Sequence, residues 1–241
     1  MRRRGVLLFV VIVAVLTFAA PPASAEFFTD LYLGGAFTAD NDLDAQFGTT
    51  LQLLEDVEFD SALVLGGRVG YWFPRPVYNT LGIGVALDVS YFEPDIDAQT
   101  VEGAQTVGGV VSVGDFVVFP IDISVVALGL DLMLRWTLLP SYDFPDGRLH
   151  PFISIGPAVF FTEAEDTTNF IPGGQSDSDT SLGFKMGAGV TYLIARNVGI
   201  FGEWRFTYFS PEWKFNDLGD SGRLETDLDT FHFLVGVALR F

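Results

Sequence analysis

The sequence predicts an all-β protein: an eight-stranded antiparallel up-and-down β-barrel that crosses a membrane. Three observations predict this fold class. Apolar residues recur at every second position in eight segments, small residues occupy the alternate positions, and the connections alternate between short and long. The 241-residue chain is also 49% hydrophobic with a net charge of −18. Disordered acidic chains lack so many apolar residues, and nucleic-acid-binding proteins need a basic surface, so both classes are excluded.

The first 25 residues have the pattern of a secretory signal peptide. Arginines at 2–4 form a basic start, an apolar run follows over 6–20, and Ala23-Ser24-Ala25 is a small-residue cleavage site. A transmembrane anchor is the alternative, but the run is short of a full span and Pro21-Pro22 follows it directly. We therefore expect cleavage after Ala25 and a barrel domain over 26–241.

Eight segments of the remaining chain show a period of two, which is typical of β-strands with one apolar face. They are Leu31–Phe37, Leu63–Phe73, Leu81–Phe92, Val126–Leu138, Ile153–Phe161, Leu182–Ile194, Val198–Tyr208 and Phe231–Phe241. Their apolar faces comprise 47 positions without a charged residue, although 18% of the chain is charged. The alternation is therefore strong enough to assign strands.

The face opposite the apolar one is rich in glycine. It holds 12 glycines, whereas the apolar face holds three, at Gly35, Gly67 and Gly202. Small residues suit the crowded interior of a narrow barrel, and large aliphatic residues suit a surface in lipid. A sheet in a bilayer leaves no edge unpaired, so the eight strands are expected to close on themselves.

The connections between the predicted strands alternate in length. Those over 74–80, 140–149 and 195–197 are short, whereas those over 39–60, 93–120, 163–180 and 210–229 are long. Short periplasmic turns and long external loops are typical of outer-membrane barrels. Aromatic residues near the strand ends are expected to form interfacial girdles, with Trp72 and Trp136 at one rim and Tyr91 and Phe231 at the other.

The last segment, T-F-H-F-L-V-G-V-A-L-R-F, is similar to the C-terminal strand that outer-membrane proteins present to their assembly machinery. Its alternating residues are Phe231, Phe233, Val235, Val237, Leu239 and Phe241. With the leader and eight strands, the chain resembles the small outer-membrane barrels of the OmpA transmembrane-domain, opacity-protein and OmpW type, a porin family. The segment N-V-G-I-F-G-E-W-R-F-T-Y-F resembles the penultimate strand of opacity-like members. The resemblance implies a Gram-negative outer membrane, contact with its lipid and lipopolysaccharide, and contact with the assembly machinery.

Ionisable residues on the inner face form the first candidate site. They are Asp30, Arg68, Asp88, Asp131, Arg135, Lys185, Glu203, Arg205 and Arg240. Charges at membrane depth are costly unless they are paired or hydrated, so they are functional candidates. They predict either a polar conduit or a plug of satisfied ion pairs. We favour the plug, because side chains usually fill an eight-stranded barrel.

The four long connections carry most of the acidic residues. They hold 23 of the 31 acidic residues and two basic residues, Lys214 and Arg223. Clustered carboxylates that could hold a divalent cation are Asp40, Asp42, Asp44, Asp227 and Asp229. The clusters lack the glycine and distal glutamate of an EF-hand, so a solvated acidic surface is the favoured interpretation.

The sequence favours a structural or surface-interaction role without catalysis. Lipid-modifying barrels pair a serine with a histidine, but His232 has no serine two positions later and His150 lies at the periplasmic end. A narrow channel for ions or small solutes is the main alternative, and a lipid A-modifying enzyme is the least favoured. We expect a monomer without a cofactor. The absence of cysteine excludes disulfides and thiol chemistry.

Overall fold

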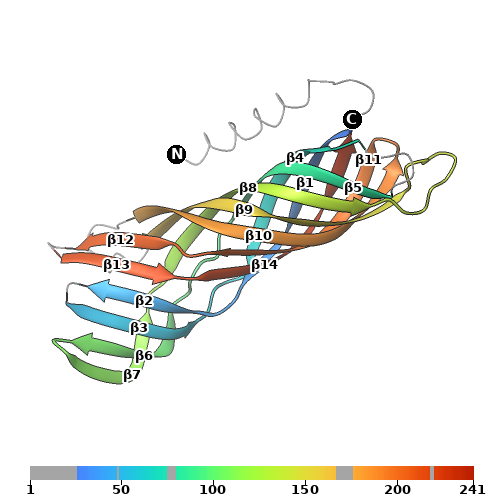
Figure 1. Ribbon diagram of the computed structural model, residues 1–241. Helices are drawn as coiled ribbons and strands as arrows, with labels where there is room; N and C mark the ends of the chain where they lie inside the picture. Colours follow the sequence, from blue (N-terminus) through green and yellow to red (C-terminus); the bar gives the residue numbers. More distant parts are fainter. Residues whose placement is uncertain (1–25, 48, 75–79, 167–175, 218–219) are drawn as a thin grey trace.

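The computed structural model describes residues 26–241 except 48, 75–79, 167–175 and 218–219. The predicted signal peptide lies outside the described residues. Within the described ranges, no helix is long and apolar enough to cross a membrane. The described chain forms fourteen β-strands in two sheets (Figure 1).

Eight of these strands form a closed antiparallel barrel, as the sequence predicts. They are β1 (Glu26–Thr38), β4 (Ala62–Trp72), β5 (Leu81–Phe92), β8 (Ile121–Trp136), β9 (Leu149–Asp166), β10 (Ser176–Ala195), β11 (Val198–Phe209) and β14 (Leu228–Arg240). Their order around the barrel is β1-β14-β11-β10-β9-β8-β5-β4, and β4 pairs with β1 to close the ring. Each barrel strand therefore neighbours the barrel strands before and after it in the sequence.

Side chains alternate between the two faces of the barrel wall. Leu31 is 45% exposed on the outside, whereas Asp30 is 2% exposed inside. Inward glycines allow the strands to lie close to each other: a Cβ atom on Gly156 would lie 1.8 Å from the carbonyl oxygen of Leu130. On the outer face, a Cβ on Gly202 would meet nothing nearer than 3.9 Å. The inner face has little space for side chains and the outer face has more, which explains why small residues lie inside and large residues outside, as the sequence predicts.

Trp72 corrects one expectation about the aromatic girdles. It is 3% exposed and lies inside the barrel, where its ring stacks on Phe28 with centroids 5.4 Å apart. Its neighbours Tyr71 and Phe73 lie on the outer face, with ring centroids 5.2 Å apart. The alternation of strand residues, counted from Arg68, gives Trp72 an inward direction.

A second sheet of six strands, here called the distal sheet, occupies much of the segments expected to be loops. Its strands are β2 (Asn41–Phe47), β3 (Thr50–Val57), β6 (Gln99–Val107), β7 (Val110–Val118), β12 (Glu212–Asp217) and β13 (Asp220–Thr226). Their order is β12-β13-β2-β3-β6-β7. The sheet lies beyond the end of the barrel that is opposite the C-terminus (Figure 1). Runs such as L-Q-L-L and V-V-S-V are too short and too weakly alternating for the sequence to predict these strands.

The distal sheet has one buried face and a tight hairpin. Leu43, Leu54 and Trp213 are each at most 6% exposed and belong to the core that continues from the barrel. The β6–β7 hairpin turns at Gly108 and Gly109, whose φ angles are 57° and 84°. A two-residue turn with two positive φ angles favours glycine and matches the twist of the paired strands. This turn therefore lets β7 pair with β6 as a regular antiparallel strand.

Candidate functional site: an ion-pair network in the barrel lumen

All nine predicted inward ionisable residues lie in the barrel lumen. Each is at most 7% exposed. They come from β1, β4, β5, β8, β10, β11 and β14, so every barrel strand except β9 contributes. With Glu26, they are here called the lumen network.

The centre of the lumen network is a continuous series of ion pairs. Arg68 contacts Asp30 at 2.9 Å and Glu203 at 3.2 Å. Arg205 then contacts Glu203 at 2.9 Å and Asp88 at 3.2 Å. Asp30 and Arg68 are direct partners in the β1–β4 register, so strand pairing alone brings these two charges together.

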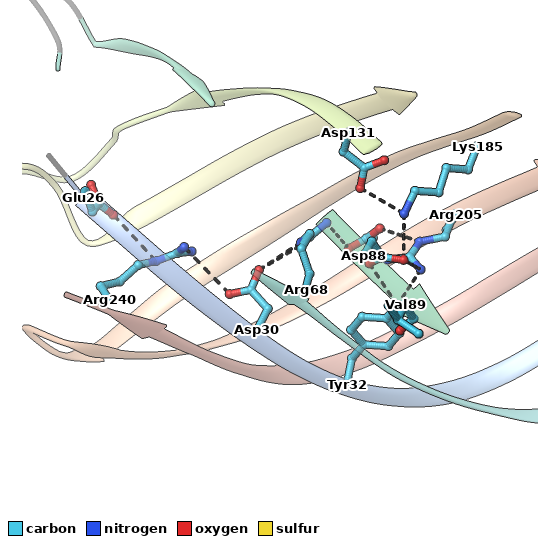
Figure 2. Close-up of polar contacts among 11 residues, drawn as sticks. Glu26, Asp30, Tyr32, Arg68, Asp88, Val89, Asp131, Lys185, Arg205 and Arg240 are labelled. Atoms are coloured by element: carbon cyan, nitrogen blue, oxygen red, sulfur yellow. Dashed lines mark hydrogen bonds and ion pairs between the residues drawn. The ribbon is translucent and has the colours of Figure 1, made fainter. Parts of the chain in front are cut away.

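The series ends at a lysine that joins two carboxylates. Lys185 Nζ lies 2.7 Å from Asp88 and 3.0 Å from Asp131. The Tyr32 hydroxyl donates to Asp88 at 3.0 Å and accepts from Arg205 at 2.9 Å. Figure 2 shows these side chains pointing toward one another across the lumen. The network therefore connects opposite walls of the barrel.

Glu26 is a member that the sequence analysis missed. It forms a two-pronged ion pair with Arg135, and its Oε1 atom lies 3.8 Å from Arg240. Arg240 also lies 3.8 Å from Asp30, which links this end to the central series (Figure 2). Glu26 precedes the first recognised alternating segment, but it has the same parity as Asp30. With Glu26, the network has five acids and five bases.

Aromatic rings support the four arginines of the lumen network. Arg135 lies over Trp72 at 4.3 Å, and Arg205 lies over Tyr32 at 4.7 Å from the ring centroid. Arg240 lies 4.9 Å from the Phe28 ring, and Arg68 lies 5.3 Å from Phe152. A guanidinium over a ring gains electrostatic attraction while excluding water.

A layer of rings lies between the lumen network and the distal sheet. Phe160 and Phe209 stack with centroids 3.9 Å apart, and Phe92 packs against His232 at 5.1 Å. His232 is 1% exposed, and its Nε2 atom lies 3.0 Å from the Thr207 hydroxyl. Buried aromatic and histidine rings thus occupy the lumen on the distal side of the lumen network.

The predicted cation-binding aspartates lie in the distal region but do not converge. Asp42 and Asp44 are exposed on one face of β2. The Asp227 carboxylate accepts from the hydroxyls of Ser210 and Tyr208. Among the described residues, no group of three or more acidic or histidine side chains is placed to hold a metal ion. An extended strand separates its carboxylates, so sequence proximity does not gather them around one point.

An acidic hollow opens beside β3 and β6. Its volume is about 350 Å³. Its lining residues are Glu55, Asp56, Glu58, Gln99, Thr100, Val101 and Glu102. The sequence analysis did not find it, because strand pairing alone brings these two segments together.

The fold is similar to those of solved outer-membrane proteins. OprG from Pseudomonas aeruginosa has a TM-score of 0.53 and 14% identity, covering 90% of this chain and 96% of that chain. Neisserial surface protein A has a TM-score of 0.42 and 13% identity, with coverages of 91% and 98%. Ail of Yersinia pestis has a TM-score of 0.40 and 10% identity, with coverages of 91% and 100%. No curated protein matches the sequence.

A family model decides the classification. The model described as the outer membrane protein beta-barrel domain matches residues 10–241, which is nearly the whole chain. The closed ring of eight strands and the apolar outer face agree with that match. The chain therefore belongs to the outer-membrane β-barrel family and is a protein of the bacterial outer membrane.

Proposed function

We propose that the barrel is a closed scaffold that presents the acidic distal sheet outside the cell, in a structural and surface-interaction role. The observation that carries this proposal is the lumen network, a balanced set of ion pairs between the barrel walls, of which every member except Glu26 is buried. Breaking one buried pair leaves a charge without a partner and costs several kcal/mol, on the order of 3–5. A lumen crossed by such ion pairs leaves little space for a conduit, so we favour a scaffold.

The distribution of polar residues supports outward presentation. The connections at the distal end carry 23 of the 31 acids, whereas the opposite end has short turns. Barrels of this class place short turns in the periplasm and long segments outside. The apolar belt would contact outer-membrane lipid and lipopolysaccharide. The C-terminal strand would contact the assembly machinery after a leader over 1–25 is removed.

The surroundings of the two histidines support a role without catalysis. Nε2 of His150 lies 3.2 Å from the Gly147 carbonyl oxygen, and Nε2 of His232 lies beside the Thr207 hydroxyl. Within the described structure, the Nδ1 atom of each ring lacks a hydrogen-bond partner. A histidine base in a triad needs an acid on that atom to hold its tautomer and orientation.

Planar-bilayer recording tests the closed scaffold against the channel alternative. We expect the purified protein to insert without producing stepwise currents, because ion pairs and rings fill its lumen. Insertion is checked separately by reconstitution into vesicles and heat-dependent migration on a gel.

An Arg205→Ala variant identifies the origin of any current. If the unmodified protein gives reproducible steps, and their size or ion selectivity changes in this variant, the current passes through the lumen. That outcome would replace the scaffold with a narrow channel. If the unmodified protein is inserted and produces no stepwise current, the recording supports the scaffold.

A further inference from the structure

The two edges of the distal sheet differ. At the β12 edge, backbone N–H groups donate to carboxylates of β10: Glu212 to Asp179 at 3.3 Å and Lys214 to Asp177 at 2.7 Å. At the other edge, β7 pairs with β6, and the described chain places no strand on its far side. Every second residue of such a strand directs its N–H and C=O groups away from the sheet. The β7 edge is therefore open to backbone pairing.

Apart from the single charge of Asp115, the open edge lacks the features that usually protect such strands. Exposed edges commonly carry lysine, proline or a bulge, which prevent pairing with other chains. The β7 sequence is V-V-S-V-G-D-F-V-V, and its register with β6 is continuous from Val107↔Val110 to Gln99↔Val118. Val113 is 81% exposed. This edge combines strand-forming residues with a regular backbone.

An apolar surface lies beside the open edge. Register places Leu53, Ala104 and Val113 in one row across β3, β6 and β7. The adjacent row contains Leu51 and Val111, which are 51% and 62% exposed. These side chains share the face of the sheet opposite its buried core. A strand added to β7 would extend both rows.

The same half of the sheet carries only negative charge. Strands β3, β6 and β7 contain Glu55, Asp56, Glu102 and Asp115 and no lysine or arginine. Glu102 and Asp115 are direct partners in the β6–β7 register, so two like charges lie side by side next to the edge. Like charges directly opposite each other are destabilising, and a basic side chain beside them would relieve the repulsion.

We propose that the β7 edge binds an extended, basic segment of a partner protein by strand addition. The partner backbone would pair with β7, its aliphatic side chains would cover Val111 and Val113, and a lysine or arginine would lie beside Asp115 and Glu102. The expected partner segment therefore has a high propensity for β-strand formation and contains both aliphatic and basic residues. This inference rests on the proposed function, because the distal sheet must face the outside to meet such a partner.

A second copy of the chain fits the edge poorly. Pairing β7 with another β7 would bring two further acids, Glu102 and Asp115 of the second copy, to a surface that has no base on its three nearest strands. Electrostatic complementarity selects partners chiefly by excluding like charges. Charge thus favours a basic segment over self-pairing.

Fluorescence anisotropy with a synthetic peptide tests the proposal on the full-length protein in detergent micelles. The probe is a short labelled peptide of alternating valine and lysine. We expect saturable binding, because strand addition supplies backbone hydrogen bonds as well as charge. A peptide of the same sequence, N-methylated on the backbone nitrogens that would face β7, should bind at least ~10-fold more weakly. Peptide binding that does not saturate would overturn the proposal.

Two variants with the same change in charge separate the edge from the rest of the sheet. Asp115→Asn removes an acid from β7, whereas Asp44→Asn removes an exposed acid from β2, three strands further in. We expect Asp115→Asn to weaken peptide binding about 5-fold or more and Asp44→Asn to change it less than about 2-fold, because screened attraction is short-ranged. Both variants should keep heat-dependent migration, which shows that the barrel is folded.

Three other results would overturn the proposal. Equal binding of the N-methylated peptide, or equal effects of the two variants, would mean diffuse charge attraction without strand pairing. Self-association in sedimentation that strengthens in Asp115→Asn would mean that the occupant is a second copy. None of these results would alter the bilayer recordings, so failure here is distinguishable from failure of the closed scaffold.

Discussion

At the scale of single residues, the lumen network shows how pairing makes buried charge tolerable. Asp88 contacts both Lys185 and Arg205 and accepts from the Tyr32 hydroxyl. Each partner comes from a different strand, so the charges are satisfied only when the ring closes. Assembly of the barrel and neutralisation of its interior are therefore the same event.

Arg205→Ala should strongly destabilise the barrel. The substitution removes the guanidinium that lies between Asp88 and Glu203, and leaves both carboxylates short of positive charge in a water-poor interior. We expect a loss of about 3–5 kcal/mol in the free energy of unfolding. Urea unfolding of the protein in lipid vesicles, followed by tryptophan fluorescence, measures the change.

Arg223→Ala provides the matched control. Arg223 is also shared by two carboxylates, those of Glu212 and Glu225, but its side chain is 46% exposed. Solvent screens such a pair, so the expected loss is below ~1 kcal/mol. If the two variants unfold at the same urea concentration, burial does not set the importance of these pairs.

At the scale of elements, the connection between β5 and β6 is held by Asp95. Its Oδ1 atom accepts from the Ile123 backbone N–H at 2.8 Å, and its carbonyl oxygen accepts from the Asp60 N–H at 2.8 Å. Partial burial raises the pKa of this carboxyl, and the neighbouring charges of Asp122, Glu93 and Asp60 raise it further, whereas the bond from Ile123 lowers it. The charged carboxylate is thus less favourable in the folded state than in the unfolded state.

Asp95→Asn should stabilise this connection near neutral pH. Because the folded pKa is raised, the protonated form contributes stability below the unfolded pKa, and this stability is lost as the pH rises through the folded pKa. An amide keeps an oxygen for Ile123 without the charge. Thermal unfolding should therefore show a higher midpoint for the variant near neutral pH and no difference in acid.

Asp97→Asn is the comparison for this pH dependence. Asp97 is exposed on the same connection, and its backbone carbonyl oxygen accepts a hydrogen bond from the Gln99 side-chain amide. The same loss of charge there should not reproduce the pH-dependent gain. A gain for Asp95→Asn that persists in acid would show that charge is not its cause.

At the scale of the whole molecule, two sheets meet different surroundings. The barrel presents aliphatic residues such as Leu63, which is 65% exposed, on its outer face. The distal sheet lies beyond the barrel end (Figure 1). Its strands carry exposed carboxylates and valines. The strong acidity of the chain is thus concentrated at one end of a lipid-embedded cylinder.

Single cysteines test the direction of this molecule in the membrane, because the natural chain has none. Val113→Cys places a thiol on β7, and Tyr142→Cys places one in a short turn at the opposite end, where Tyr142 is 99% exposed. In intact cells, a membrane-impermeant maleimide should label the first thiol and leave the second unmodified. After permeabilisation both should react. The reverse pattern would invert the proposed topology.

The sequence predicts the barrel well because its wall separates two environments residue by residue. Lipid on one side and a crowded lumen on the other impose a strict period of two, which strands such as β5 and β14 display. The same parity predicts nine members of the lumen network. It missed Glu26, because that residue precedes the recognised run, and it misplaced Trp72, because clustering near a strand end was given more weight than parity.

The distal sheet could not be predicted in the same way. Both of its faces lie outside the membrane, so alternation is weaker, and the apolar runs in β3 and β7 are short. Which strands pair depends on contacts between segments far apart in the sequence, such as Leu53 with Ala104 and Ala45 with Leu224. The acidic composition of the long connections therefore led to their assignment as loops, whereas in the structure much of them forms a second sheet.

The sequence by itself determined the class of the molecule: an eight-stranded outer-membrane barrel with an apolar belt, a charged interior and an acidic end. It did so because each position of a membrane-spanning strand is constrained by its immediate surroundings. Tertiary structure alone decided which charges pair, that the acidic end is a sheet, and that β12 is covered while β7, among the described strands, has a neighbour on one side only. Those properties depend on register and closure, which no single segment encodes.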